Sequence, residues 1–530
     1  MKNKVYHIGD TFENDTYYSV EDTLYYTPAE TVAATKQEYL SISPNNLDHL
    51  DTCIYLYNKK NITLDFCGNT LLMQGRIQPI IIDRCENITI KNCVAEFETS
   101  FSTEFEIMET GDDYILMKIN EKQNCKVVDG TIIPYGTGWE NHNLSKGFHF
   151  LACFDKKGNP RGQILFVLGN HPEYDKNCVH IPTEYLAEQV GDLIKLKGPV
   201  EDAWRVGDIL IEESEPRYRS GVNILDSKNI TIENHRILNG VGMGINAHHT
   251  KDITIKGLRM FPDERSHGIV ANSADAIHSF ACSGKFVIED CNIEAIIDDF
   301  INIHGNYLRL GKIISNTKIE CEVAARGLSA YCNVLDVGDE VLFHKGTTMA
   351  EREYNAIKEK RIIDKRTIEF ELEKPIGRAM VGDIVENLSG NSEVTVRNCN
   401  FLKANSHMRF QTRGRTIVED CSFDVPILLT GDSNFWFESN PCMDLTVRRC
   451  RFNTDRANIR IIPEFDQSEE APYYHHNIKV LDNSFKTETA MEGNGAENIE
   501  FFGNKNTDGN TFRLKLAECA DVKTDNAEIC

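Results

Sequence analysis

A short pattern of alternating apolar residues recurs along this chain and constrains its fold more than any other feature. Two apolar residues separated by one residue are followed, three positions later, by a residue that we call the repeat position. This position is a cysteine in six repeats, at Cys67, Cys93, Cys291, Cys399, Cys421 and Cys450. In four others it is His235, Leu258, Asn483 or Asn504. Where the series is unbroken, successive repeat positions lie 21 to 33 residues apart. Such a period is typical of a solenoid whose coils differ in loop length.

The runs have the periodicity of strands. Ile and Val alternate with Thr, Glu or Lys, and Asn, Asp and Gly are frequent after each run. No amphipathic helical stretch competes for these segments. Strands this short complete their hydrogen bonds and bury an apolar column only when stacked in parallel. The sequence therefore predicts an all-β protein, a right-handed parallel β-helix.

Two long breaks interrupt the repeat, over 99–219 and 306–390. They contain Val-Gly-Asp followed by apolar residues, as in Val206-Gly207-Asp208 and Val337-Gly338-Asp339, and a further Val381-Gly382-Asp383 ends the second break. We interpret the breaks as two inserted small β-barrel or β-sandwich domains. The expected organisation is N-terminal strands and first coils over 1–98, insertion one over 99–219, central coils with the candidate acids over 220–305, insertion two over 306–390, and C-terminal coils with a cap over 391–530.

Composition and charge narrow the range of partners and compartments expected for this protein. A net charge of −24 disfavours nucleic acid or an anionic membrane as a partner and suits a neutral substrate. The first residues lack the apolar core of a secretion signal, and no 18-residue apolar run occurs. We expect a cytoplasmic protein, or a secreted one if a leader has been removed. The oligomeric state is open, with a homodimer among the alternatives.

Seventeen cysteines raise the question of disulfides or a metal site. No Cys-x-x-Cys pair is present, and a residue repeated once per coil forms a file along the interior of a solenoid. A thiol in such a file fills space as a small apolar group. We expect a structural role for these cysteines, in a reducing compartment.

Three aspartates are the strongest candidates for chemistry. Asp275 is followed 23 residues later by Asp298 and Asp299. If Asp275 and Asp298 occupy equivalent places on adjacent coils, their backbones lie about 4.8 Å apart. Two carboxylates that close raise the pKa of one of them, which prepares it to donate a proton. Asp299 faces the same cleft only if the chain bends beside it.

The alternative is that these aspartates merely form turns. Their neighbours are Ala, Ile and Phe, and acids within apolar strand sequence are costly unless they are used or paired. This context favours a functional role. A converging group of acids is what sugar-cleaving chemistry requires.

Several ordered motifs carry a resemblance to a known family. They are Ser-Ala-Asp-Ala-Ile-His (273–278), Asp-Asp-Phe-Ile-Asn-Ile-His-Gly (298–305), Arg-Phe-Gln-Thr-Arg-Gly (409–414), Val-Glu-Asp-Cys-Ser-Phe (418–423), Gly-Asp-Ser-Asn-Phe-Trp-Phe-Glu-Ser-Asn-Pro (431–441) and Ile-Ile-Pro-Glu (461–464). Over roughly 220–505 the chain resembles glycoside hydrolase family 110, inverting α-1,3-galactosidases that remove terminal galactose from blood-group-B-type and linear Gal-α-1,3-Gal glycans. The pattern of insertions also resembles that family's β-helix with two inserted barrels.

The resemblance implies a role for each aspartate. Asp298 is expected to be the general acid that protonates the leaving oxygen, and Asp275 and Asp299 are expected to activate water. In an inverting enzyme the acid and base stand about 6.5–9.5 Å apart, so side chains on adjacent coils must splay. The expected substrate is an α-galactosyl oligosaccharide, and no metal or cofactor is expected.

Other residues are candidates for binding the substrate. His278 and His304 suit sugar hydroxyls or the orientation of an acid, although a strand histidine is more often a satisfied core residue. Arg409 and Arg413 are long donors expected one and two coils further on. An aromatic face such as Trp436 suits a galactose ring, and a buried structural tryptophan is the alternative. The full set of substrate-binding candidates is His278, His304, Arg409, Arg413, Asp432, Trp436, Glu438 and Glu464.

Three other functions of β-helix proteins remain. A polygalacturonase-type hydrolase acts on an anionic substrate and would carry Gly-His-Gly and Arg-Ile-Lys, which are absent here. A polysaccharide lyase would hold calcium on clustered acids and depend on it. A non-catalytic glycan-binding solenoid would need no acids within apolar strands.

Overall fold

The computed structural model describes residues 1–34, 50–141, 150–161, 185–200, 204–213, 219–324, 334–364, 366–404, 406–434, 436–466, 468 and 470–530. These residues form strands and one short 3-10 helix, η1 (Pro28–Glu30). Within the same ranges, no helix has the length and apolar character needed to cross a membrane.

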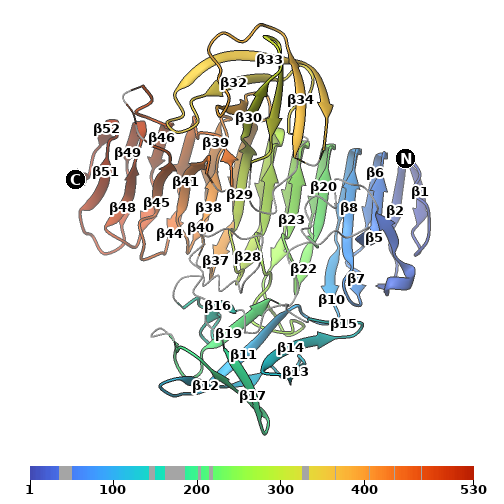
Figure 1. The fold of residues 1–530 in the computed structure, drawn as a ribbon. Helices are drawn as coiled ribbons and strands as arrows, with labels where there is room; N and C mark the ends of the chain where they lie inside the picture. Colours follow the sequence, from blue (N-terminus) through green and yellow to red (C-terminus); the bar gives the residue numbers. More distant parts are fainter. Residues whose placement is uncertain are drawn as a thin grey trace.

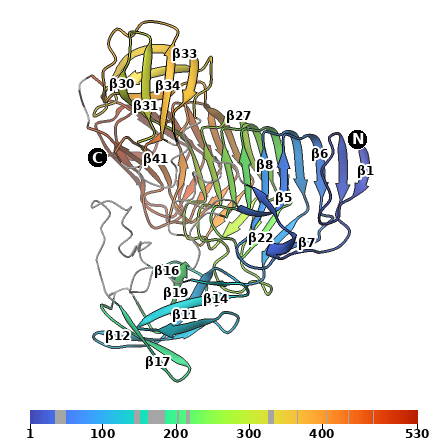
Figure 2. The same cartoon turned by 45° about the vertical axis from the view of Figure 1, so that its right-hand side comes forward.

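Three stacked sheets wind around a common core, and Figures 1 and 2 show them as one column running from the N-terminus to the C-terminus. The first sheet is parallel and contains β1 (Lys2–Val5), β2 (Thr16–Ser19), β6 (Lys60–Asp65), β9 (Glu86–Lys91), β21 (Lys228–Glu233), β24 (Lys251–Lys256), β27 (Ser283–Glu289), β36 (Ser392–Arg397), β39 (Thr416–Glu419), β43 (Leu445–Arg448), β46 (His475–Leu481), β49 (Ala496–Phe502) and β52 (Ala520–Thr524).

The second sheet is also parallel and consists of β3 (Leu24–Tyr26), β7 (Thr70–Met73), β10 (Val94–Phe97), β22 (Arg236–Leu238), β25 (Arg259–Met260), β28 (Asn292–Glu294), β37 (Asn400–Leu402), β40 (Ser422–Phe423), β44 (Arg451–Phe452), β47 (Ser484–Phe485) and β50 (Lys505–Asn506).

The third sheet carries the candidate site. Its strands are β4 (Val32–Ala34), β5 (Leu50–Tyr57), β8 (Gln78–Asp83), β20 (Val222–Leu225), β23 (Ile245–His248), β26 (Ile277–Phe280), β29 (Ile301–Asn306), β38 (Met408–Phe410), β41 (Ile427–Asp432), β45 (Ile459–Glu464), β48 (Thr489–Asn494), β51 (Phe512–Ala517) and β53 (Ala527–Ile529). They pair in parallel except for β4 against β5, and a short strand β42 (Glu438–Ser439) adds to β29 in antiparallel fashion. The predicted parallel β-helix is therefore present.

The turn from the first to the second sheet explains why Asn, Asp and Gly follow the strands. The residue before the repeat position has a positive φ, for example 56° at Asn92, 58° at Asp290 and 66° at Gly257. Asn, Asp and Gly adopt this left-handed conformation at the lowest cost. The turn then directs the following residue into the core.

The file of repeat positions is buried and joined by hydrogen bonds. The N–H of Cys291 donates to Sγ of Cys399, and the N–H of Cys399 donates to Sγ of Cys421, each at 3.4 Å. Further along, the N–H of Cys450 donates to Oδ1 of Asn483 at 2.8 Å. Every cysteine that the structure describes is free, so these thiols fill and connect the interior as expected.

The assignment of Cys67 to this file was wrong. The pairing of β6 with β9 matches Asp65 to Lys91, and the pairing of β7 with β10 matches Thr70 to Val94. Four residues follow Asp65 before Thr70, against two between Lys91 and Val94, so the turn is two residues longer. Cys67 lies in the longer turn and is exposed.

Stacked phenylalanines fill the C-terminal half of the core. Phe401, Phe423, Phe452 and Phe485 are fully buried, and the ring centroids of successive members lie 5.8, 4.9 and 4.9 Å apart. Each ring occupies the same place on its coil, so one aromatic residue per turn packs against the next.

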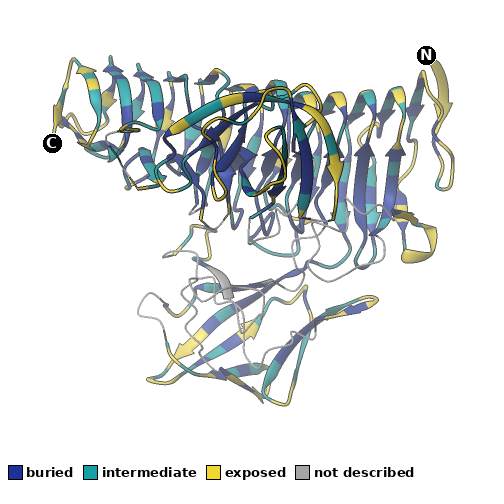
Figure 3. Cartoon of the chain, turned by 45° about the horizontal axis from the view of Figure 1, so that its top comes forward, coloured by how far each residue is buried: buried dark blue, intermediate teal, exposed yellow. Residues whose placement is uncertain are grey.

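Two groups of strands lie outside the column, on opposite sides of it in Figure 1. In the first, β16 (Phe150–Phe154), β19 (Ile209–Glu213), β11 (Ser102–Thr110), β12 (Tyr114–Ile119), β18 (Leu193–Lys197) and β17 (Leu186–Val190) form a six-stranded sheet beside β13 (Cys125–Val128), β14 (Thr131–Gly136) and β15 (Trp139–Glu140). In the second, β30 (Leu308–Ile313), β31 (Lys318–Glu322), β32 (Glu340–His344), β33 (Glu351–Ile362), β34 (Thr367–Leu372) and β35 (Ile384–Asn387) form a closed barrel. The sheets of the first group do not close within the described residues. Figure 3 shows the buried interiors of the column and the barrel.

The three Val-Gly-Asp motifs are turns that lead into strands of these insertions. A carboxylate oxygen of Asp208, Asp339 or Asp383 accepts the backbone N–H of the residue three positions earlier, at 3.0, 2.8 and 2.7 Å. The glycine has a φ of 91° to 95° in each motif, which only glycine adopts readily.

Phe423→Ala should lower the free energy of unfolding by about 3–5 kcal/mol, because it leaves a cavity between two stacked rings. Urea unfolding followed by circular dichroism measures this change. Val337→Ala is the matched control, since Val337 is 61% exposed and its truncation leaves no cavity. Equal stabilities of the two variants would contradict the role assigned to the aromatic stack.

Candidate active site

The register of the third sheet brings two aspartates together. Ile277 pairs with Ile301, and the N–H of Ala276 donates to the carbonyl oxygen of Asp299 at 2.9 Å. Counting back two residues from each strand partner places Asp275 beside Asp299. The expectation that Asp275 and Asp298 are the equivalent residues was therefore wrong, because this coil is 24 residues long rather than 23.

Asp298 joins them because the chain bends before β29. Residues 297 and 298 form this bend, and Oδ1 of Asp298 accepts the N–H of Asp299 at 3.1 Å. One carboxylate oxygen from each of Asp275, Asp298 and Asp299 lies within 4.8 Å of the others. The predicted convergence and the predicted bend are confirmed. The expected splay to about 6.5–9.5 Å is not seen between these oxygens.

Asp299 is buried and bonded through both of its carboxylate oxygens. Its Oδ2 lies 2.7 Å from Nε of Arg409, while its Oδ1 accepts the hydroxyl of Ser406 and, at 3.0 Å, the N–H of His407. Burial raises the pKa of Asp299 to about 6, Arg409 opposes this rise, and the charge of Asp298 adds to it. Asp299 therefore changes its charge in slightly acidic solution.

Arg409 is the cation at the centre of the site. Burial by itself would lower the pKa of this guanidinium, but the carboxylates of Asp299, Glu438, Asp298 and Asp275 raise it above its usual value. Glu438 reaches the site because β42 pairs with the end of β29, and its Oε2 lies 3.7 Å from Nη1 of Arg409. The site thus alternates negative and positive groups.

The three aspartates also resemble a cation site in their spacing. Three convergent carboxylate oxygens suit a hard cation such as Ca²⁺. The guanidinium of Arg409 already pairs with Asp299, however, and a bound cation would lie against this fixed positive charge. These three carboxylates are therefore better suited to pair with the arginine than to bind a metal ion.

Two of the predicted binding residues near the acids are histidines. His278 and His304 are buried and contact each other, with their Nε2 atoms 3.1 Å apart, and Nε2 of His304 lies 3.8 Å from Oε1 of Glu438. Trp436 is 37% exposed, two residues from Glu438. It is thus not the buried structural tryptophan of the alternative interpretation.

Asp432 and Glu464 pair across β41 and β45. The carboxylate of Asp432 is buried and accepts backbone N–H groups of Asn434, Trp436 and Phe437, which shapes the loop that leads to β42. Glu464 is open to solvent, but partial desolvation of its carboxyl raises its pKa, and the nearby charge of Asp432 raises it further.

Arg413 is directed toward the barrel. Its Nε and Nη2 donate to the two carboxylate oxygens of Glu386 at 2.5 and 3.0 Å, and Glu386 is fully buried in β35. Arg413 lies between β38 and β39 on the coil of Arg409, so the expected placement two coils on was wrong. Its bidentate pair connects the barrel to the column.

Sequence reasoning missed residues on the C-terminal side of the acids. Ser406 occupies the place of Asp299 on the next coil, since Met408 pairs with Ile301, so the two-residue offset from the strand was a usable signal. Its neighbour His407 has a pKa lowered to about 3 by burial and by Arg409 and other arginines. Nη2 of Arg456 donates to the carbonyl of Ser406 at 3.1 Å.

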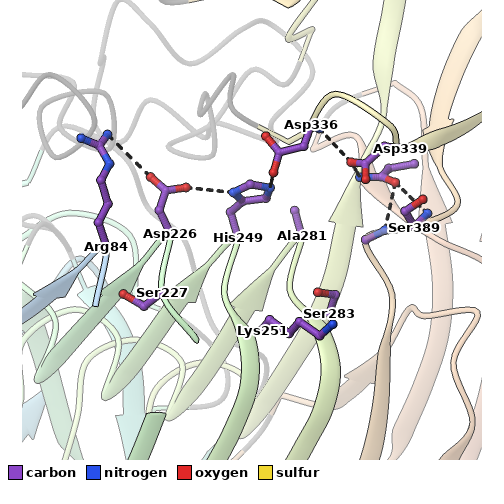
Figure 4. A pocket seen from close by; sticks show the side chains of 12 residues that line it. Arg84, Asp226, Ser227, His249, Lys251, Ala281, Ser283, Asp336, Asp339 and Ser389 are labelled. Carbon is purple, nitrogen blue, oxygen red and sulfur yellow. Dashed lines mark hydrogen bonds and ion pairs between the residues drawn. The ribbon is translucent and has the colours of Figure 1, made fainter. Parts of the chain in front are cut away.

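A separate cavity of about 480 Å³ lies at the opposite ends of the same strands, between the column and the barrel (Figure 4). His249 crosses it, with Nδ1 2.8 Å from Asp226 and Nε2 3.2 Å from Asp336. Burial lowers the pKa of His249, but hydrogen bonds to Asp226 and Asp336 outweigh it and raise the pKa to about 9. This cavity is lined by polar groups, and Arg84 and His249 pair with the aspartates beside them.

Comparison with curated proteins finds relatives over most of the chain. The chain is 24% identical over 472 residues to α-1,3-galactosidase B of Bacteroides thetaiotaomicron, covering 85% of this chain and 74% of the relative. It is 25% identical over 462 residues to α-1,3-galactosidase A of Bacteroides fragilis, covering 82% and 71%, and 27% identical over 492 residues to α-1,3-galactosidase B of Phocaeicola vulgatus, covering 86% and 79%. No family model matches the chain.

Solved structures give a weaker likeness. A mannuronan C-5 epimerase A-module of Azotobacter vinelandii aligns with a TM-score of 0.32 at 7% identity, covering 97% of this chain and 87% of that one. A family 28 exopolygalacturonase of Yersinia enterocolitica aligns with a TM-score of 0.33 at 10% identity, covering 98% and 74%. These scores are too low to define a shared architecture. The likeness that the comparisons establish is one of sequence, to proteins named α-1,3-galactosidase.

Arg409→Met should raise the pKa of Asp299 further above 6, by about one to three units, because it removes the cation that stabilises the ionised carboxylate. A ¹³C NMR titration of the aspartate carboxyls measures this, with Asp299→Asn to assign the signal. Arg448→Met is the control, since Arg448 pairs with Glu419 on the first sheet. An unchanged titration of Asp299 in Arg409→Met would contradict the assigned ion pair.

Proposed function

We propose that this protein is an exo-acting glycoside hydrolase that releases terminal galactose from α-1,3-linked galactosides with inversion of configuration. The observation that carries this proposal is the convergence of Asp275, Asp298 and Asp299 within 4.8 Å beside one arginine. The sequence similarity to proteins named α-1,3-galactosidase supports the choice of sugar and linkage.

Asp298 is proposed as the general acid. It is the least buried of the three carboxyls, and it is displaced from the register that pairs Asp275 with Asp299. A proton donor has to reach the bridging oxygen between galactose and the next sugar, at the open side of the site. Asp298 then protonates that oxygen as the bond to the anomeric carbon breaks.

Asp275 and Asp299 are proposed to bind and activate the attacking water. They come from adjacent coils at equivalent places, so one water between them can donate a hydrogen bond to each carboxylate. Asp299 must be ionised to take the proton of the water. Because its pKa is about 6, the rate should fall as the pH drops below that value.

Inversion is the outcome expected of water held by two carboxylates. Separations near 5 Å are common in enzymes that form a covalent intermediate, so the close oxygens alone do not favour inversion. The supporting feature is Asp299 itself. Its two oxygens are engaged by Arg409, Ser406 and the backbone of His407, which fixes it as an acceptor and restrains it from attacking carbon.

The rest of the site suits a neutral sugar. Arg409 and Glu438 offer a donor and an acceptor beside the acids, and Trp436 offers an exposed aromatic face. Galactose combines several hydroxyls with one apolar face, which such groups bind. Asp432, by contrast, is proposed to act through the loop that it closes.

One second function is favoured by a specific observation. The three carboxylates could hold calcium, as a lyase or a calcium-dependent binding protein would require. A chelator would then abolish activity, whereas a galactosidase that uses Arg409 as its counter-ion retains full activity in the chelator.

The purified protein should hydrolyse Gal-α-1,3-Gal and leave Gal-α-1,4-Gal intact, with β-galactose as the first product seen by ¹H NMR. α-Galactose as the first product would refute inversion. Binding of the disaccharide without hydrolysis would refute the enzyme and leave a glycan-binding solenoid.

Asp298→Asn should abolish hydrolysis of the disaccharide but retain measurable activity on an aryl α-galactoside, whose leaving group needs no proton. Initial rates on both substrates and the melting temperature are measured together. Asp290→Asn is the matched control, because Asp290 lies in an exposed turn of the same coil at a φ of 58° that Asn tolerates. Equal losses on both substrates would reject Asp298 as the acid.

A further inference from the structure

Two buried histidines face each other beside the acids. Nε2 of His278 and Nε2 of His304 are 3.1 Å apart, and the two residues are 6% and 3% exposed. A hydrogen bond between two ring nitrogens needs one N–H and one lone pair. Which nitrogens carry hydrogen follows from the groups that bond the other side of each ring.

An unbroken chain of amides fixes the hydrogen on His278. The side-chain N–H₂ of Gln78 donates to two backbone carbonyls, those of Ile80 and Ser220, at 3.1 and 2.6 Å. Carbonyls only accept, so the orientation of the Gln78 amide is determined. Its Oε1 must then accept from Nδ2 of Asn223, at 3.1 Å.

The same argument applies to the next amides along the third sheet. With its N–H₂ committed to Gln78, Asn223 presents Oδ1 to Nδ2 of Asn246, at 3.0 Å. Asn246 in turn presents Oδ1 to Nδ1 of His278, also at 3.0 Å. An amide oxygen accepts only, so Nδ1 of His278 carries a hydrogen.

His304 is fixed from its other side. Its Nδ1 lies 2.6 Å from the backbone carbonyl of Gly305, so this nitrogen also carries a hydrogen. Two neutral rings would then turn two bare lone pairs toward each other across 3.1 Å. One additional proton between the two Nε2 atoms removes this conflict and completes the hydrogen bond.

We propose that His278 and His304 share one extra proton at neutral pH, so that the pair carries a single positive charge that holds Glu438 in place beside Arg409. Oε1 of Glu438 lies 3.8 Å from Nε2 of His304 and also accepts from Nδ2 of Asn302 at 3.4 Å. Oε2 of Glu438 lies 3.7 Å from Nη1 of Arg409.

The proton resides on His304. Burial, the charge of His304 and the neighbouring His248 all lower the pKa of His278. On His304 the charge lies next to the carboxylate that neutralises it. Both histidines are positioning residues, since they act on the aspartates through Glu438 and Arg409.

Other titratable and charged groups of the described residues lie around the pair. The ring of His248, from β23, lies 6.2 Å from that of His278, and its pKa is lowered to about 3 by burial, so His248 stays neutral. Nε2 of His248 donates to Oδ1 of Asn246 at 3.0 Å, as a neutral ring can. Beyond the pair lie the charged groups Glu438, from β42, and Arg409, from β38.

The role of the pair in catalysis rests on the proposed hydrolase function, but its charge does not. With the proton present, Glu438 has a cation on each side, and Arg409 remains directed at Asp299. When the proton is lost at higher pH, Arg409 is the one cation among the described residues around the pair that still attracts the carboxylate of Glu438. Activity should therefore decline on the alkaline side as the pair loses its charge.

The first test measures the charge directly. In protein labelled with ¹⁵N-histidine, NMR at neutral pH should show, besides the imidazolium of His249, an imidazolium with hydrogens on both nitrogens that changes in His278→Gln and is thereby assigned to the pair. In that variant the new amide N–H donates to Nε2 of His304, so His304 should become neutral with hydrogen on Nδ1. Two neutral rings in the wild-type protein would overturn the proposal, whether or not the variant folds.

The second test separates positioning from folding. His278→Gln should lose about tenfold in kcat/KM on an aryl α-galactoside near neutral pH and lose the alkaline decline, with an unchanged melting temperature. His248→Gln is the matched control, because it removes a neutral imidazole from the same series of hydrogen bonds and keeps a donor for Asn246. A His278→Gln pH profile identical to that of wild type would overturn the positioning role, and absence of galactosidase activity in every form would instead refute the proposed function.

Discussion

The parallel register of the third sheet is the constraint on which the site depends. Each coil repeats its hydrogen bonds on the next, so residues at equal distances before successive strands come to lie about 4.8 Å apart. Asp275, Asp299 and Ser406 hold the same place on three successive coils. A change of one residue in any of these loops would separate the carboxylates, because strand register sets the direction of every side chain.

Because positive and negative groups alternate in the site, several carboxylates can be held close together without unfolding the protein. The sequence from His304 through Glu438 and Arg409 to Asp299 places opposite charges next to each other, at distances of 3.8, 3.7 and 2.7 Å. A buried carboxylate without a partner would be protonated or would destabilise the fold. The same arginine that stabilises Asp299 also limits how far burial can raise its pKa.

Much of the fold could be predicted from the sequence, because one residue per coil was visible as a repeat. The apolar alternation and the Asn, Asp or Gly turns indicated the strands, and the convergence of the three aspartates followed from the winding. Exact register did not follow, because it depends on turn lengths. Cys67 was misplaced by a turn two residues longer than the next, and Asp298 was matched to Asp275 in place of Asp299.

Contacts between distant segments were the least predictable part of the site. Arg413 was expected near the sugar, but Glu386 of the barrel, 27 residues earlier in the chain, binds it. The pairing of His278 with His304 likewise depends on how the two rings turn, which no sequence pattern specifies. Ser406, in contrast, carried a signal in its offset from β38.

The most direct test of the account is a crystal structure of Asp298→Asn with Gal-α-1,3-Gal bound. The account predicts the bridging oxygen within hydrogen-bond distance of residue 298 and a water held between Asp275 and Asp299 on the far side of the anomeric carbon. A disaccharide bound elsewhere, for example in the cavity crossed by His249, or a metal ion held among the three carboxylates, would contradict it.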